Sequence, residues 1–257
     1  MLADWVVDLL RCPETGQMLK PCPDGLQRLG DGKVYVDHDG IAALVYPHQL
    51  DGDDAKMNRL YEKLAPFYDW TERVLGRLLT GLDMQKGRED IVNRLHLLPG
   101  MRLLEVSPGP GVFQALLRAA VGRAAHLAAL DLSLNMLRQC RQQHAAERVE
   151  LIQGNAQHLP FADNAFDALF HFGGVNLFND PNRALAEFVR VVRPGGIVAW
   201  GDEQMSDEFQ HPVGRRVLPR MNPGFFKTPP PTPAGLTELQ RHVVYGGLGY
   251  LVVGQKL

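Results

Sequence analysis

The sequence is short of cysteine: its 257 residues include three, Cys12, Cys22 and Cys140. An odd and sparse set cannot form the disulfide framework of a small secreted domain, and it suits a reducing compartment. Also missing are a run of about twenty apolar residues and, at the N-terminus, the basic start and small-residue cleavage site of a signal peptide. We therefore expect a cytoplasmic protein without a membrane span.

A surplus of charge of either sign is absent as well. The chain has 27 Lys and Arg residues and 29 Asp and Glu residues, which leaves a net charge of −2. This balance argues against a protein whose main task is to grip a phosphate backbone, so nucleic acid is not the favoured partner. The apolar share of 45% is ordinary for a globular protein, and the length allows one large domain with an appendage.

What the chain does contain is a strand, a tight glycine turn and a helix in direct succession. Residues 103–106 are apolar apart from Glu105. Gly109 and Gly111 follow, and a helical spacing of apolar residues begins immediately afterwards. Because glycine has no Cβ, the backbone of such a turn can come close to a ligand. The amides at the start of the next helix then face the polar groups of that ligand.

A second strand, over 127–130, ends in Asp131. An acidic side chain at that place can accept hydrogen bonds from both hydroxyls of a ribose, as it does in nucleoside-binding units of strand, helix and strand. A nicotinamide dinucleotide site would carry a third glycine, where this chain has Gln114. The spacing therefore favours a different nucleoside ligand.

Strands and helices go on alternating from residue 99 to the end of the chain. Strands are predicted over 102–106, 127–131, 149–153, 166–171 and 197–200, helices over 112–121, 134–146 and 181–192, and a final hairpin over 242–245 and 250–253. This alternation predicts an α/β fold in which helices cover both faces of a parallel sheet, with ligands at the carboxyl ends of the strands. Those ends carry Glu105, Asp131, Asn155, Phe170 and His171.

Together these motifs resemble the class I, Rossmann-like family of S-adenosylmethionine-dependent methyltransferases. The residues that carry the resemblance are Glu105 with Ser107, Gly109 and Gly111, Asp131 with Leu132 and Met136, the segment Gly154-Asn155-Ala156, and the turn Pro194-Gly195-Gly196. It covers residues 55–257 and implies a seven-stranded Rossmann-like sheet with helices on both faces and an antiparallel last strand. It also implies S-adenosyl-L-methionine as cofactor and S-adenosyl-L-homocysteine as product.

The family pattern assigns cofactor contacts to a defined set of residues in this chain. They are Tyr61, Tyr68, Glu105, Ser107, Gly109, Gly111, Asp131, Leu132, Met136, Asn155, Ala156, Phe170 and His171. Two of them depart from the pattern. Ser107 stands where the family has a glycine, and Asn155 stands where it has an aspartate. An asparagine can still bind there, as donor and acceptor of hydrogen bonds instead of as a charge.

Residues 51–98 are predicted to form a helical linker and lid. Residues 61–69 resemble the lid of the quinone and sterol group of the family, in which this segment closes over the cofactor and a tyrosine reaches its methionine end. Tyr61 and Tyr68 are the residues concerned, although aromatic residues crowded in this way would equally pack two helices together. A cover that excludes water would strengthen the electrostatics of the site.

Residues 1–50 resemble the small zinc-ribbon-like domain that accompanies some methyltransferases and their activating partners. A zinc ribbon uses Cys-x-x-Cys pairs as ligands, but Thr15 stands where Cys12 would have its partner. We expect a small α+β unit of degenerate ribbon type, without metal, that contacts the main domain, a second copy of the chain in a homodimer, or a substrate. Residues 99–257 are then the methyltransferase domain.

Methyl transfer mainly requires that donor and acceptor be positioned and that water be excluded. A general base is needed only where the acceptor has a proton to lose. His171, which follows the fourth strand, is the first candidate for that base and Asn176 the second, although a histidine there is as often structural. We expect a methyltransferase that acts at oxygen or carbon of a small or lipid-like acceptor of quinone or phenol type, roofed by residues 202–234.

Two other functions stay open at this stage. One is methylation of an RNA base, because a ribbon combined with a methyltransferase domain also occurs in that group. The other is a non-catalytic protein that binds S-adenosylmethionine or its product and serves as a scaffold or biosynthetic partner. Ser107 and Asn155, which depart from the family pattern, would permit the second of these.

Overall fold

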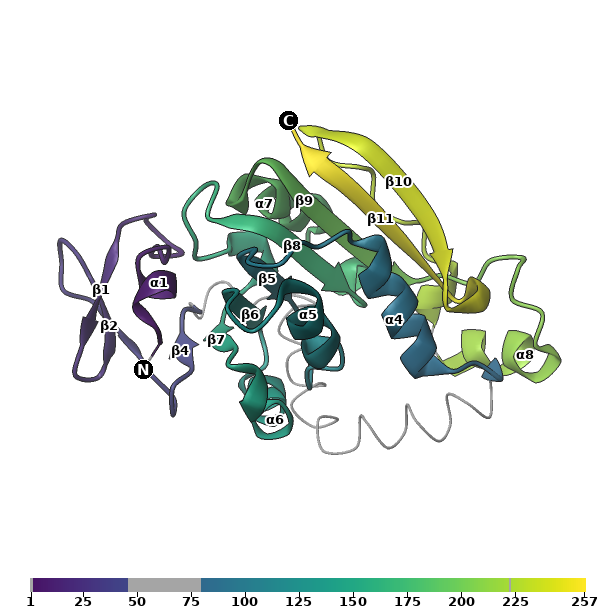
Figure 1. Ribbon diagram of the computed structural model, residues 1–257, viewed down its shortest axis with the longest axis horizontal. Helices are drawn as coiled ribbons and strands as arrows, with labels where there is room; N and C mark the ends of the chain where they lie inside the picture. The colour runs from purple at the N-terminus through teal and green to yellow at the C-terminus, as the bar shows by residue number, and fades with distance from the viewer. Residues whose placement is uncertain (1, 46–79, 222) are drawn as a thin grey trace.

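The computed structural model of the chain describes residues 2–45, 80–221 and 223–257. Tyr61 and Tyr68, the two lid positions, lie outside the described residues. The described part contains one large sheet, a second small sheet near the N-terminus, and helices on both faces of the large one (Figure 1). The predicted α/β class is therefore confirmed. In the part of the chain that the structure describes, no helix has both the length and the apolar character needed to cross a membrane.

The large sheet has eight strands, of which the six that are not at the C-terminus run parallel. In spatial order they are β10 (Leu236–Val244), β11 (Gly249–Lys256), β9 (Val192–Glu203), β8 (Phe166–Phe172), β5 (Leu103–Val106), β6 (Leu127–Asp131), β7 (Glu150–Gln153) and β4 (Ala42–Ala43). The last strand along the chain, β11, runs antiparallel to both of its neighbours, β9 and β10, so the predicted antiparallel last strand is confirmed. The seven strands predicted for the methyltransferase domain are β5 to β11, and β4 from the N-terminal segment adds an eighth strand at one edge.

Helices bury the two faces of this sheet separately. The helices are α4 (Met84–Arg94), α5 (Gln114–Val121), α6 (Leu134–Gln143), α7 (Pro181–Val191) and α8 (Pro212–Met221). On one face Ile91 of α4 and Leu117 of α5 pack into the same core cluster as Leu103 of β5. On the other, Phe188 of α7 shares a cluster with Leu104. Neighbouring strand residues point to opposite faces, so a strand covered on both sides reads as an unbroken apolar run.

The two ends of α7 compare differently with the sequence prediction. Asp180 caps α7 by accepting a hydrogen bond from the Arg183 amide at 3.0 Å, and Pro181 opens the helix, as the sequence predicts. The predicted turn at residues 194–196 was wrong. Strand β9 starts directly at Val192, and these residues lie within it at an irregularity of its pairing with β8.

The N-terminal segment is bonded directly to the large domain. Its helix α1 (Asp4–Val7) precedes a three-stranded antiparallel sheet of β1 (Leu19–Cys22), β2 (Gly25–Arg28) and β3 (Val34–Val36). The Arg11 amide donates to the Pro160 carbonyl at 2.9 Å, and the Leu44 amide donates to that of Gln153 at 2.8 Å. Val6 and Leu10 are fully buried in the same cluster as Phe161. Contact with the main domain is therefore part of the fold, whereas the ribbon-like identity of the segment stays a prediction.

The thiol of Cys12 has its own partners in this segment. Its Sγ lies 3.1 Å from the hydroxyl of Tyr35 and accepts a hydrogen bond from Arg28 Nη1 at 3.3 Å. Burial raises the pKa of Cys12, but hydrogen bonds from Thr15, Tyr35 and Arg28 outweigh it and bring the pKa to about 6. The thiol of Cys12 is therefore held by polar partners within the small unit.

Candidate functional site

The turn after β5 is built from three residues in the left-handed backbone region. Ser107 has φ +56°, Gly109 +55° and Gly111 +93°. A Cβ at Gly111 would lie 2.7 Å from the Cys140 sulfur, so this glycine lets the turn pack against α6. A Cβ at Gly109 would meet no atom of the described residues within 4 Å. Gly109 therefore has open space in front of its backbone, which is the arrangement that a closely approaching ligand needs.

Asp131, the last residue of β6, holds this turn in place. Its Oδ2 accepts a hydrogen bond from the Gly109 amide at 3.0 Å, and its Oδ1 accepts one from the Ser133 amide at 2.9 Å. The residue is 9% exposed. A carboxylate can accept about four hydrogen bonds, so the same group can anchor the turn and receive ligand hydroxyls. The structure thus brings the predicted glycine turn and the predicted ribose acid together.

Glu105 lies underneath this turn and is almost fully buried. Gln114 Nε2 donates a short hydrogen bond to its Oε2. Burial, and then the negative charge of Asp131, raise the pKa of Glu105 to about 8, against a lowering by the bond from Gln114. The carboxyl group therefore carries a proton at pH 7 in the ligand-free chain. Gln114 Oε1 is buried and has no hydrogen-bond partner among the described residues.

The residues predicted to contact an adenine follow β6 and β7. The Leu132 carbonyl accepts a hydrogen bond from Gln153 Nε2 at 3.1 Å, and Met136 is 2% exposed in the first turn of α6. Asn155 Oδ1 accepts from the Gln157 amide at 2.8 Å and so caps a short 3₁₀ helix that begins at Ala156. An aspartate could make the same cap, so the departure from the family pattern leaves this turn intact.

The neighbours Phe170 and His171 point to opposite faces of β8. Phe170 packs edge-to-face on Phe113 with ring centroids 5.0 Å apart, on the side of α4 and α5. His171 is fully buried on the side of α7, between the rings of Phe178 and Phe188. The strand therefore separates two residues that the family pattern placed together at the cofactor.

The tautomer of His171 follows from its one hydrogen bond. Nδ1 lies 2.9 Å from the Val106 carbonyl, and because a carbonyl only accepts, Nδ1 carries the hydrogen. Burial lowers the pKa of His171, so the ring is neutral at pH 7. Nε2 is then a buried lone pair without a partner among the described residues. The ring ties the end of β5, from which the glycine turn departs, to β8.

Asp202 is a site residue that the sequence interpretation missed, since it was noted only as part of the roof segment. Its Oδ1 and Oδ2 accept hydrogen bonds at 2.9 Å from the amides of Gly174 and Asn176. This carboxylate therefore holds the loop that follows β8 and carries the second candidate base. The signal that could have found it was available: Asp202 lies near the carboxyl end of a predicted strand, like Glu105 and Asp131.

Further polar atoms without partners gather near Asp202. His171 is the register partner of Trp200 in the β8–β9 pair, and Asp202 is that of Tyr250 in the β9–β11 pair. Four buried side-chain atoms in this region have no hydrogen-bond partner among the described residues. They are His171 Nε2, Trp200 Nε1, Tyr250 Oη and Asn176 Nδ2. Buried groups of this kind are rare in native proteins, and each calls for a water or ligand contact.

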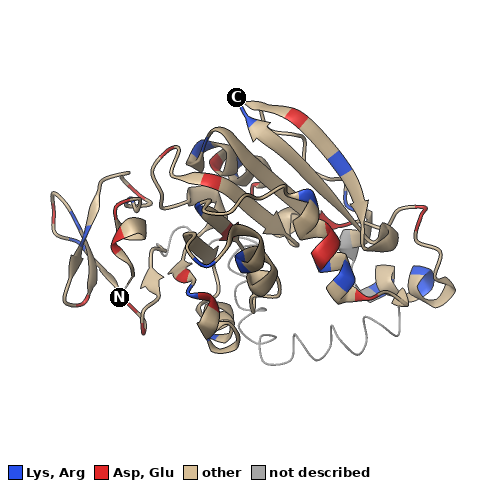
Figure 2. Cartoon of the chain, in the orientation of Figure 1, with Lys and Arg blue, Asp and Glu red and all other residues tan. Residues whose placement is uncertain are grey.

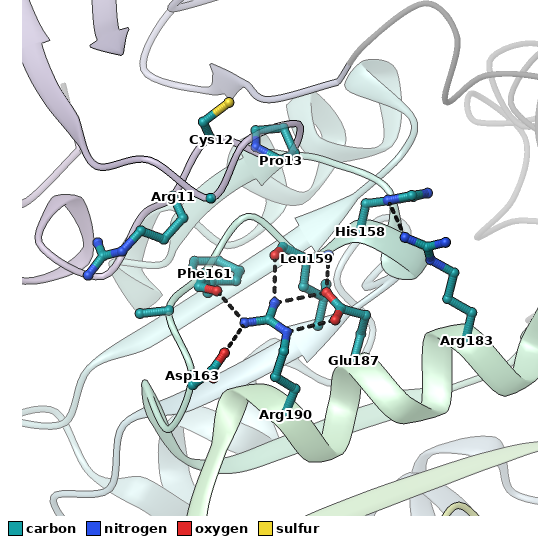
Figure 3. A pocket seen from close by; sticks show the side chains of 12 residues that line it. Arg11, Cys12, Pro13, His158, Leu159, Phe161, Asp163, Arg183, Glu187 and Arg190 are labelled. Atoms are coloured by element: carbon teal, nitrogen blue, oxygen red, sulfur yellow. Dashed lines mark hydrogen bonds and ion pairs between the residues drawn. The ribbon is translucent and has the colours of Figure 1, made fainter. Parts of the chain in front are cut away.

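A cavity of about 450 Å³ lies elsewhere, between the N-terminal segment and α7. Arg190 lines this cavity and forms ion pairs with Glu187 and Asp163, while Arg183 contacts His158 (Figure 3). None of the predicted site residues lines this cavity. The cavity therefore lies between the two parts of the chain and is distinct from the glycine turn.

Comparison with known proteins agrees with this geometry. Residues 104–200 match the family described as "Methyltransferase domain". The chain is 34% identical over 166 residues to a demethylmenaquinone methyltransferase of Renibacterium salmoninarum. This alignment covers 64% of this chain and 63% of the relative. It is 35% identical over 149 residues to the protein of the same name from Geobacillus kaustophilus, covering 56% of this chain and 61% of the relative. The alignments thus span less than two thirds of these relatives.

Solved structures show the same fold at low identity. A SAM-dependent methyltransferase from Aquifex aeolicus superposes with a TM-score of 0.52 at 19% identity, covering 78% of this chain and 98% of that chain. A complex between the Haloferax volcanii Trm112 methyltransferase activator and a putative methyltransferase gives 0.55 at 15% identity, covering 76% and 97%. These likenesses show that the described sheet and helices have the class I methyltransferase fold.

Proposed function

We propose that this chain, whose residues 104–200 form a class I methyltransferase domain, transfers the methyl group of S-adenosyl-L-methionine to a quinone-type small molecule. The observation that carries the proposal is the bond between the Asp131 carboxylate and the Gly109 amide, in front of which the backbone is open. Asp131 lies at the end of β6, where it could hold the ribose of a nucleoside. The same residue positions the glycine turn, whose open backbone could accommodate the chain that extends from that ribose.

The residues present fit this cofactor in chemistry. Asp131 would accept the ribose hydroxyls, and Leu132 with Met136 would supply an apolar contact for the adenine. The open backbone at Gly109 would accommodate the amino-acid tail, whose positive charge would favour the ionised form of Glu105. When bound, the cofactor supplies a methyl group activated by its sulfonium. The roles of Tyr61 and Tyr68 remain predictions.

The class of acceptor rests on the relatives. Proteins named demethylmenaquinone methyltransferase align with 56–64% of this chain, and their name indicates a quinone-type acceptor. The side-chain amide of Asn176, in the loop after β8, also has a buried nitrogen without a partner among the described residues, and it would donate to an oxygen of such a ring. Transfer to carbon or oxygen of a reduced quinone is the reaction that fits both points.

We assign His171 a positioning role. Its Nδ1 holds the Val106 carbonyl, and its ring is covered by Phe178 and Phe188 in the described residues. Asp202 has the corresponding role for the loop that carries Asn176. Rigid placement of donor and acceptor is the main catalytic requirement of methyl transfer, and these two contacts supply it from either side of β8.

The test is turnover with a defined acceptor. The full chain would be incubated with S-adenosylmethionine carrying a labelled methyl group and with a chemically reduced naphthoquinone, and the product analysed by mass spectrometry. We expect a labelled quinone from the wild-type chain and less of it from D131A at a cofactor concentration that does not saturate the variant. Labelled RNA in a parallel reaction, or cofactor binding without turnover on quinones, phenols and RNA, would replace this proposal by one of the two other functions.

A further inference from the structure

The segment that borders the carboxyl edge of the sheet is strongly basic. Residues 211–230 contain four cations, Arg215, Arg216, Arg220 and Lys227, and no Asp or Glu, in a chain whose net charge is −2. Arg216 and Arg220 are exposed on α8, where blue segments mark the helix in Figure 2. Arg215 pairs with Asp207 at 3.7 Å. Among the described residues, the other three cations have no carboxylate partner, so the segment presents positive charge to the outside.

The same segment exposes two apolar side chains. Phe226 is 70% exposed and Val213 is 52% exposed, whereas the adjacent Phe225 is buried against Phe209 and Leu248. Phe225 thus anchors the segment, while its neighbour points outward. We refer to Val213, Arg216, Arg220, Phe226 and Lys227 as the basic–apolar patch. Apolar side chains among cations are typical of surfaces that lie in a membrane interface.

The basic–apolar patch is joined to the candidate acceptor site. Lys227 Nζ donates a hydrogen bond to the Asn176 carbonyl at 2.9 Å, and the Met205 amide donates to the Phe225 carbonyl at 3.1 Å. Asn176 belongs to the loop that Asp202 holds after β8. A molecule that arrives at the patch therefore reaches the loop with the unpaired polar atoms without crossing the rest of the chain.

We propose that the basic–apolar patch docks the chain on an anionic lipid bilayer, from which a lipid-like acceptor enters the site. The inference rests on the proposed function for the nature of the acceptor. Charge complementarity identifies the occupant, since the surface of anionic lipids attracts Lys and Arg side chains. Phe226 and Val213 enter the boundary between head groups and acyl chains, which a soluble anion or a free phosphate does not offer.

The test is sedimentation of the full chain with vesicles of 30% phosphatidylglycerol in phosphatidylcholine, compared with vesicles of phosphatidylcholine alone. We expect binding to the anionic vesicles that weakens with added salt. Each removed cation lowers the partition coefficient about fivefold, so R216Q/R220Q lowers it roughly 25-fold. F226S lowers it about tenfold. The matched control is L98S/R123Q, which removes an exposed apolar and an exposed basic residue at the opposite edge of the sheet and leaves binding unchanged.

Turnover on a water-soluble reduced quinone separates this inference from the proposed function. Patch variants that lose vesicle binding and keep soluble turnover support docking by the patch. Soluble turnover by a wild-type chain that binds neither kind of vesicle overturns the docking and leaves the methyltransferase intact. Equal loss of vesicle binding in L98S/R123Q overturns it too. So does binding of a single-stranded RNA that depends on Arg216 and Arg220 but not on Phe226.

Discussion

The amide of Gly109 donates a hydrogen bond of 3.0 Å to Asp131, so the glycine turn after β5 is held by the acid at the end of β6. Two elements that the sequence separates by 21 residues therefore form one unit. A change at either residue affects both the shape of the turn and the group expected to hold the ribose. The first two predictions concern these two residues.

Replacement of Asp131 by alanine removes the acceptor of the Gly109 amide and of the ribose hydroxyls. We expect D131A to bind S-adenosylhomocysteine more weakly by about 1–3 kcal/mol, as the loss of hydrogen bonds to a buried diol implies. Titration calorimetry measures the difference. D39A, which changes an acid with a 75% exposed side chain, is the control and keeps the wild-type affinity. Equal affinity of D131A and the wild type would remove Asp131 from the ribose role.

Replacement of Gly109 by alanine places a Cβ where the ligand would lie. Gly122 offers a matched control, because it too has a positive φ, +83°, and no atom within 4 Å of a built Cβ, but it lies at the end of α5. Both substitutions lower stability, because each places a Cβ on a backbone conformation with positive φ that residues other than glycine rarely adopt. We expect only G109A to lose cofactor affinity in addition. Equal affinity of the two variants in calorimetry would mean that the backbone at Gly109 does not face the ligand.

The buried acid Glu105 predicts a dependence of stability on pH. The folded chain keeps its proton up to a pKa of about 8, whereas the unfolded chain releases it near the ordinary value of 4.5. Between these values the folded state binds more protons, so this group makes the free energy of unfolding fall as pH rises. E105Q has no such proton. We therefore expect the stability of E105Q relative to the wild type to increase from pH 5 to pH 8 in urea unfolding. Parallel pH profiles would contradict the neutral state of Glu105.

Substitution of His171 separates a positioning role from a base. Asparagine can keep a donor for the Val106 carbonyl but cannot accept a proton, and leucine can do neither. We expect H171N to retain most of its cofactor affinity and kcat, and H171L to lose about 1–3 kcal/mol of stability, because a buried carbonyl is left without its donor, and to bind the cofactor more weakly because the end of β5 is no longer held. A kcat that collapses in H171N at unchanged cofactor affinity would instead make His171 the base.

Most of the fold was accessible from the sequence because its strands and helices obey local rules. The strand predicted over 127–131 is observed as Leu127–Asp131, and the helix predicted over 181–192 as Pro181–Val191. What escaped depends on long-range pairing. Nothing local in the sequence shows that Ala42 and Ala43 pair with the free edge of β7 and become the eighth strand of the sheet. The strands β1 and β2 and the helix α8 were not predicted at all.

The candidate site was predictable in part for the same reason. Glycines, and acids at strand ends, are visible in a linear sequence, so Gly109 and Asp131 could be paired before their contact was known. Which face of β8 carries His171 could not be read, because both faces are apolar and either side chain of the pair Phe170 and His171 could have faced the cofactor. Asp202 could have been noticed as an acid near the carboxyl end of a predicted strand, but its partners could not, because the backbone amides that it binds leave no trace in the sequence.

The most direct test of a methyltransferase cofactor site at the glycine turn is a crystal structure of the full chain with S-adenosylhomocysteine bound. We predict ribose hydroxyls within about 3.2 Å of the Asp131 carboxylate and the amino-acid tail against the backbone of Gly109. A nucleoside bound elsewhere, for example in the cavity beside Arg190, with the turn and Asp131 making no contact to it, would contradict the account.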